Sequence, residues 1–264
     1  MDKYLNTGIK EVITAFPPVG DALNEYNIGC VPCAVGTCLL KDVVKIHALS
    51  PENEQRLMSR IENIIYPRRK VSALPPPLPQ KPLKSAEIKY SPPLRKLVEE
   101  HALIKRLLAL IPAIVKNLDM KKDKKLVLEC ADFIRNFADK YHHAKEEDIL
   151  FKYFDPELDV LKVMHADHTA GRGHVKALLL AVKNNKAVEA AEHLAAYGEL
   201  LSGHIKREDE VLYPWMDRTL STSQIGNIHL KFSMANAEAK GVQEKYEKFT
   251  NNLENRFKKG RKEK

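Results

Sequence analysis

The sequence predicts an all-α protein built around an up-down-up-down four-helix bundle. Apolar residues recur at helical spacing over four long segments, short turns separate these segments, and strand-like alternation is absent. A small helical domain is expected before the bundle and a further helix after it. The 264-residue chain contains 44% hydrophobic and 30% charged residues, which is the composition of an ordinary globular protein.

Prolines divide the chain. Seven of the fifteen prolines lie between residues 75 and 93, and proline disfavours helix both at its own position and at the residue before it. We therefore expect an extended linker over residues 71–93. This linker separates a helical domain over 1–70 from the bundle over 94–216, and an additional helical segment with a basic tail follows over 217–264.

The first domain is expected to contain four short helices. Pro17-Pro18 ends the first of them, and Ser50-Pro51 begins the last, because serine is a favourable N-cap and proline suits the first helical turn. The predicted helices span residues 7–16, 19–26, 38–48 and 50–65.

The bundle helices are longer. They are expected over residues 94–118, 126–154, 158–182 and 187–215, with turns at Asp155-Pro156 and Asn184-Asn185. A fifth amphipathic segment over residues 225–257 predicts either one extra helix or a helical hairpin.

Charge and composition narrow the function. The net charge is +8, but the last nine residues alone contribute +5, so the excess lies in a basic tail and nucleic-acid binding is not expected. No apolar run is long enough to cross a membrane, and the N-terminal residues do not resemble a signal peptide, so a cytoplasmic location is expected. Four cysteines are too few for a disulfide scaffold.

Histidine placement is the most informative feature. Each bundle helix carries a histidine on its apolar face, at His101, His142, His168 and His204. Two of these histidines have a carboxylate four residues on, as His142 with Glu146 and His204 with Glu208. Residues at this spacing share a helix face, so each pair can chelate one metal ion.

The second bundle helix offers a competing pair, His143 with Glu147. The face of His142 also carries Ile134, Ala138 and Ile149, whereas the face of His143 carries Arg135, Asp139 and Leu150. The first face is the more apolar one, so we expect His142 and Glu146 to be buried and Glu147 to face the solvent.

Two buried glutamates are costly unless a cation neutralises them. Imidazole and carboxylate ligands suit iron, manganese or zinc. At least four histidines and two glutamates are too many ligands for one closed tetrahedral zinc site. The pattern therefore predicts a two-metal, carboxylate-bridged centre inside the bundle.

Four segments carry a family resemblance. They are EEHALIKRLL, YHHAKEEDILF, HADHTAGR and GHIKREDEVLYP, at residues 99–108, 141–151, 165–172 and 203–214. In order and spacing they resemble the hemerythrin-like HHE cation-binding family. The resemblance implies a non-haem centre of two iron ions, with the terminal ligands His101, His142, His168 and His204 and the bridging carboxylates Glu146 and Glu208.

One departure from that family concerns the third helix. Oxygen-carrying members usually present a fifth histidine, but the positions four residues from His168 hold Met164 and Arg172. The candidates for the missing ligand are His143 and a solvent molecule, and an open position suits reaction or sensing better than stable oxygen carriage. Three further histidines are predicted to be structural or surface residues, at positions 165, 174 and 193.

Three cysteines lie close together in the first domain. Cys30, Cys33 and Cys38 form a C-x2-C-x4-C pattern, which indicates redox or metal chemistry; the alternative is a structurally inert turn. The segment resembles small cysteine-bearing domains that precede hemerythrin-like domains in proteins linked to repair of iron–sulfur centres and nitric oxide stress. That resemblance implies thiols that deliver electrons to the centre or sense redox state. Cys130 is expected to be a buried apolar residue.

Three functions remain open from the sequence. The first is a di-iron protein that binds or senses a diatomic gas, oxygen or nitric oxide. The second is a di-iron redox enzyme or repair protein, which would need an electron donor. The third is a helical interaction module that a metal ion stabilises.

Overall fold

The computed structural model describes residues 1–262 except for residues 27, 29–37, 47–48, 68–89 and 117. These residues divide into two compact units, Met1–Lys89 with Glu210–Arg218, and Tyr90–Asp209 with Thr219–Lys264. Apart from one isolated bridge between Gly8 and Leu39, the regular structure in the described ranges is helical, which confirms the all-α prediction. None of the helices in these ranges is long and apolar enough to cross a membrane.

The first unit contains the predicted short helices and one more at the N-terminus. Their bounds are α1 Asp2–Leu5, α2 Ile9–Ala15, α3 Pro18–Glu25, α4 Leu40–Ile46 and α5 Pro51–Ile65. The Ser50 side chain accepts a hydrogen bond from the Asn53 backbone N–H, as the predicted N-cap requires. Leu57 and Ile61, one turn apart on α5, are fully buried in the core of this unit.

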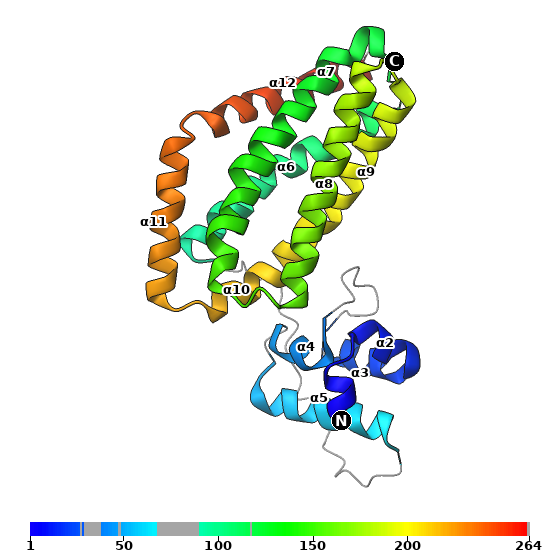
Figure 1. Cartoon of the computed structure of the whole chain (residues 1–264), viewed down its shortest axis with the longest axis vertical. Helices are drawn as coiled ribbons and strands as arrows, with labels where there is room; N and C mark the ends of the chain where they lie inside the picture. The colour runs from blue at the N-terminus through cyan, green and yellow to red at the C-terminus, as the bar shows by residue number, and fades with distance from the viewer. Residues whose placement is uncertain (27, 29–37, 47–48, 68–89, 117, 263–264) are drawn as a thin grey trace. The chain divides into compact units, whose positions relative to one another are not determined.

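The second unit contains the bundle, whose helices α6, α7, α8 and α9 lie side by side (Figure 1). The bounds are α6 Pro92–Val115, α7 Met120–Phe133 with its continuations η1 Ile134–His143, η2 Glu146–Leu150 and η3 Phe151–Tyr153, α8 Asp159–Lys183, and α9 Ala187–Arg207 with its continuation η4 Glu208–Leu212. The short α10, Tyr213–Thr219, follows η4, and Glu210–Arg218, which comprise the end of η4 and most of α10, belong to the first unit. The turn predicted at Asn184-Asn185 is present, with Asn185 in the left-handed region at φ 55°.

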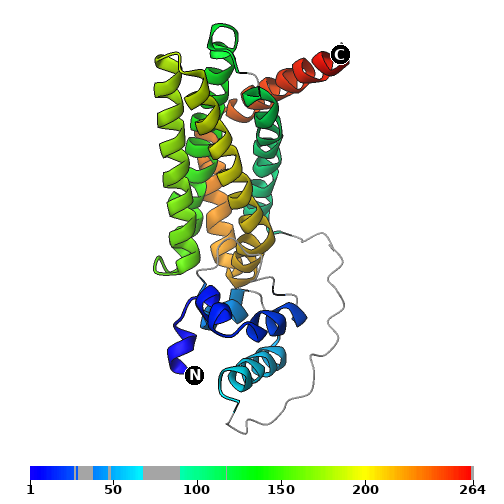
Figure 2. The same ribbon diagram turned by 90° about the vertical axis from the view of Figure 1, so that its right-hand side faces the viewer.

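Two helices follow the bundle, so the alternative of a single long helix is wrong. They are α11 Thr222–Glu238 and α12 Val242–Lys262, and Gly241 between them has a φ of 82°, which favours glycine. Ser221 and Gln224 form a capping box at the start of α11. Helix α11 packs against α6 and η2, and α12 packs against α6 and η1 (Figure 2).

The segments η1, η2 and η4 are π-helical, which the sequence did not predict. A π-turn is wider than an α-turn and is found frequently at functional sites. The π-helical segments carry four of the candidate ligands, namely His142, His143, Glu146 and Glu208. The regular helix therefore changes its geometry where the candidate site begins.

The linker predicted over residues 71–93 lies mostly outside the described residues. Its last two prolines, Pro92 and Pro93, form the first turn of α6, where their missing N–H groups cost nothing. The bundle helix thus begins two residues before the predicted boundary.

Candidate metal centre

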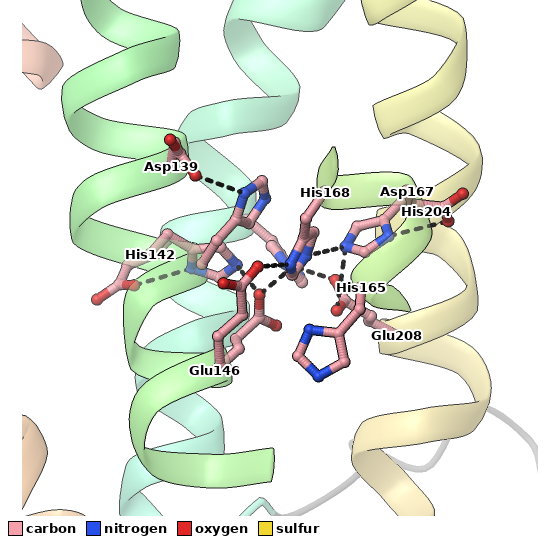
Figure 3. Close-up of polar contacts among 12 residues, drawn as sticks. Asp139, His142, Glu146, His165, Asp167, His168, His204 and Glu208 are labelled. Carbon is pink, nitrogen blue, oxygen red and sulfur yellow. Dashed lines mark hydrogen bonds and ion pairs between the residues drawn. The ribbon is translucent and has the colours of Figure 1, made fainter. Parts of the chain in front are cut away.

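The predicted ligand side chains converge inside the bundle (Figure 3). They come from every bundle helix: His101 from α6, His142 from η1, Glu146 from η2, His168 from α8, His204 from α9 and Glu208 from η4. All six are almost completely buried, with exposures between 0 and 2%. The expectation that His142 and Glu146 face the core is confirmed.

The side chains form two groups with metal-binding spacing. The first, which we call the cavity-side group, consists of His143, Glu146, His168 and His204. The second, the α11-side group, consists of His101, His142, Glu146 and Glu208. Within each group the ligand atoms lie within 4.8 Å of one another.

Two carboxylates join the groups. Glu208 Oε1 lies 3.2 Å from His204 Nε2, and Glu208 Oε2 lies 3.2 Å from His101 Nε2. Glu146 Oε2 lies 3.5 Å from His168 Nε2 and 3.8 Å from His142 Nε2. Each carboxylate therefore reaches both groups, as a bridging ligand must.

An outer carboxylate holds the rear nitrogen of each of four rings. The Nδ1-to-oxygen distances are 2.7 Å for His101 to Asp209, 3.0 Å for His142 to Glu100, 2.5 Å for His168 to Glu147 and 3.2 Å for His204 to Asp167. An ionised carboxylate only accepts hydrogen bonds, so each Nδ1–H donates. The lone pair is then on Nε2, which faces the centre, and this is the tautomer that a metal-binding histidine needs.

With this tautomer, the hydrogen-bond acceptors of the centre face one another without a proton or cation between them. With Nδ1 protonated, His101 Nε2 and Glu208 Oε2 are two acceptors only 3.2 Å apart, and the Nε2 atoms of His168 and His204 face each other at 3.0 Å. The buried Nε2 of His142 has no hydrogen-bond partner within the described residues. Buried acceptors that face one another are costly, and metal ions placed among them would remove that cost. The residues present therefore fit a metal centre.

The pKa values show the same demand for positive charge. Burial alone would lower the pKa of His204, but the charges of Glu208 and Asp167 outweigh it and raise the pKa to about 9. Burial and the neighbouring His168 lower the pKa of His143 to about 3, which keeps that ring neutral and able to bind metal. The negative field at His204 favours a cation, and a metal ion can take the place of the proton.

The outer contacts of the α11-side group include a buried ion pair. Glu100, which holds His142, is fully buried and accepts a hydrogen bond from Lys145, itself only 2% exposed. Lys145 Nζ also donates to Asn236 Oδ1 of α11 at 3.2 Å and lies 3.8 Å from the centroid of the Tyr141 ring. Helix α11, which follows the bundle, thus completes the surroundings of one predicted ligand.

The structure corrects two expectations about the competing pair. Glu147 does not simply face the solvent: it holds His168 Nδ1 and pairs with Arg172, whose guanidinium lies 2.8 Å away. His143, expected on the more polar face, is 5% exposed, and its ring stacks on that of His168 with centroids 3.9 Å apart. The wider π-turn of η1 brings the neighbours His142 and His143 inward together.

The remaining histidines and the cysteines play a smaller part in the described structure. His165 is exposed, although its ring, Glu147 and His168 offer a third set of close ligand atoms, and His174 and His193 are partly exposed. Cys30 and Cys33 lie outside the described residues. The Cys38 carbonyl accepts a hydrogen bond from the Ile9 N–H, and Cys130 is buried, as expected. The redox role of Cys30, Cys33 and Cys38 stays a prediction.

Inward histidines and glutamates from four helices define a metal-binding helical bundle. Comparison with protein families agrees, because residues 93–216 match the model described as the hemerythrin HHE cation binding domain. These residues are a hemerythrin HHE cation-binding domain, and the match covers all of the predicted ligands.

Curated relatives add no function. The chain is 27% identical over 136 residues to uncharacterized proteins of Mycobacterium bovis and Mycobacterium tuberculosis, which covers 47% of this chain and 53% of each relative. The chain therefore spans about half the length of the curated relatives it matches. No solved structure matches it.

Proposed function

We propose that the bundle holds two iron ions and uses them to bind a diatomic gas, oxygen or nitric oxide. The observation that carries this proposal is the position of Glu208. Its two oxygens each lie 3.2 Å from the Nε2 atom of a histidine in a different part of the centre, His101 and His204. One carboxylate would thus serve two metal positions.

The donor set supports iron. Imidazole and carboxylate suit iron, manganese and zinc, and the hemerythrin resemblance favours iron among them. Five rings and two bridging carboxylates offer fewer donor atoms than two six-coordinate ions need, so an external ligand has room to bind. Bound iron(II) would supply the electrons that stabilise a bound gas.

The chain's own residues would bind the metal ions, orient the ligand rings and limit access to the centre. Asp209, Glu100, Glu147 and Asp167 each hold a proton on Nδ1 of one histidine and so fix the direction of its Nε2. The rings of His143 and His168 line a cavity in the bundle, and we assign gas entry to this side.

The test is metal analysis of the full-length chain, purified anaerobically with iron, together with absorption spectra before and after addition of oxygen or nitric oxide. We expect about two irons per chain, as in bundle-borne carboxylate-bridged centres, and a spectral change that reverses when the gas is removed. A chain that holds zinc and no iron, with spectra that no gas changes, would refute the proposal and favour a structural metal. Catalytic consumption of the gas with an added reductant would favour a redox enzyme instead.

A further inference from the structure

A cavity of about 290 Å³ lies beside the cavity-side group, between η1, α8 and α9. The rings of His143 and His168 line its metal-facing end, and Arg135 and Lys176 lie about two helical turns further along η1 and α8. This volume is close to the lower end of the range for small-molecule binding sites. The cavity lies entirely within the second unit.

A glycine keeps this cavity open. A Cβ atom at Gly171 of α8 would lie 3.5 Å from Cε2 of Tyr197 on α9, which is ordinary contact, so a larger side chain there would extend into the cavity. The walls are mainly apolar and include Val175, Leu179 and Leu201. An apolar ligand body would gain the free energy of leaving water, on the order of 25 cal/mol per Å² of surface.

The rim is positively charged. Arg135 and Lys176 are exposed, and neither forms an ion pair within the described part of the chain. The two carboxylates that line the cavity, Asp139 and Asp167, each pair with an arginine, and Arg172 also pairs with Glu147. Asp139 pairs with Arg172, and Asp167 pairs with Arg207. The cavity is therefore complementary to an anion.

We propose that the cavity binds a small amphipathic carboxylic acid. Its carboxylate faces the charges of Arg135 and Lys176, and its apolar body packs against Val175, Leu179 and Leu201. A bound acid covers the His143 and His168 end of the centre and so restricts access to it. The binding itself requires neither iron nor a gas, so it is tested independently of the proposed function.

Calorimetric titration of the full-length chain with hexanoate, hexanol and hexylamine tests the proposal. We expect hexanoate to saturate one site and to bind about tenfold more tightly than the other two compounds, a difference of about 1.4 kcal/mol. The double variant Arg135→Gln with Lys176→Gln should abolish the preference for the acid.

Two variants fill the cavity. Gly171→Leu should weaken hexanoate binding at least tenfold, and Leu179→Phe, at a half-buried wall position, repeats the test if the first variant does not fold. The matched control is Gly173→Leu, because a Cβ at Gly173 meets nothing within 4 Å, and it should bind hexanoate normally. Hexanoate binding that survives both filling variants, or that disappears when metal is removed, would overturn the proposal. Equal binding of hexanoate and hexanol would overturn the assignment of an acid.

Discussion

The two metal-binding groups have similar ligands but different surroundings. In the cavity-side group, Glu147, the outer carboxylate of His168, is 23% exposed and pairs with Arg172, which is 43% exposed. In the α11-side group, Glu100, the outer carboxylate of His142, is fully buried and pairs with Lys145, which is also buried. Asp209, which holds His101, is 17% exposed and pairs with Lys105, which is 53% exposed. One group adjoins a cavity, whereas the His142 side of the other is enclosed by charged and aromatic side chains.

This difference shows that the ligand residues of a metal position and the access of external molecules to it are determined by different parts of the structure. A partly exposed ion pair is screened by water and tolerates change, whereas a buried pair is costly to break. We infer that the cavity-side position exchanges external ligands and that the α11-side position holds its metal more permanently. The predictions below test this inference, and the largest expected effect comes first.

The two bridging glutamates should matter to both groups at once. Glu146→Ala and Glu208→Ala should each remove most of the bound metal, because each deletes an anion that both positions share. Metal content after purification measures the effect. Glu199→Ala is the control, since Glu199 is exposed on α9. Loss of only half of the metal from either variant would mean that the two positions do not share that carboxylate.

Breaking the buried ion pair of the α11-side group should destabilise the protein more than breaking the partly exposed ion pairs of the cavity-side group. Lys145→Met should lower the free energy of unfolding by about 3–5 kcal/mol, because it leaves Glu100 charged and buried. Arg172→Met should cost only about 0–1 kcal/mol, since its ion pairs are partly exposed. Urea unfolding with a chelator present measures both effects without a contribution from metal.

A second substitution checks the cause of this loss. Adding Glu100→Gln to Lys145→Met should recover much of the lost stability, because the buried charge is then removed. Equal costs for Lys145→Met and Arg172→Met would show that the α11 side is not the more enclosed one.

The outer carboxylates should tune metal affinity. Glu147→Gln and Glu100→Gln should each weaken metal binding by about 10–100-fold, because a neutral amide polarises the Nδ1–H group less than a carboxylate does. Competition with a chromophoric chelator measures the change, and Asp148→Asn, at an exposed neighbouring position, is the control. Normal affinity in Glu147→Gln would contradict the role of that carboxylate in holding His168.

Helical periodicity was sufficient to predict the bundle and the inward histidines, because both depend on local spacing. It did not predict the π-turns, which widen the helix without changing the apolar pattern. His143 was therefore expected on the more polar face. Periodicity alone cannot identify such a position.

The outer carboxylates were missed for a different reason. Each of them contacts a histidine that is distant in sequence or on another helix, so no local motif marks the pair. Glu100 is an exception, because its position in the sequence did indicate a buried carboxylate. It shares a helix face with Leu97, Ile104 and Leu107, where a glutamate needs a partner. Its partner Lys145 became evident only when the helices were assembled.

Substituting two glycines with alanine should distinguish the cavity wall from a packed helix face, and these variants should have the smallest effects on stability. A Cβ at Gly171 has room, so Gly171→Ala should stabilise α8 by about 0.5–1 kcal/mol through reduced entropy of the unfolded chain. A Cβ at Gly198 would lie 3.1 Å from Ile111 Cδ1, so the same change there should give no gain or a net loss. Gly173→Ala, with nothing nearby, gives the reference gain, and thermal unfolding ranks the three variants. A gain at Gly198 equal to that at Gly173 would mean that α9 packs less closely on α6 than the structure shows, and a loss at Gly171 would mean that the cavity is narrower.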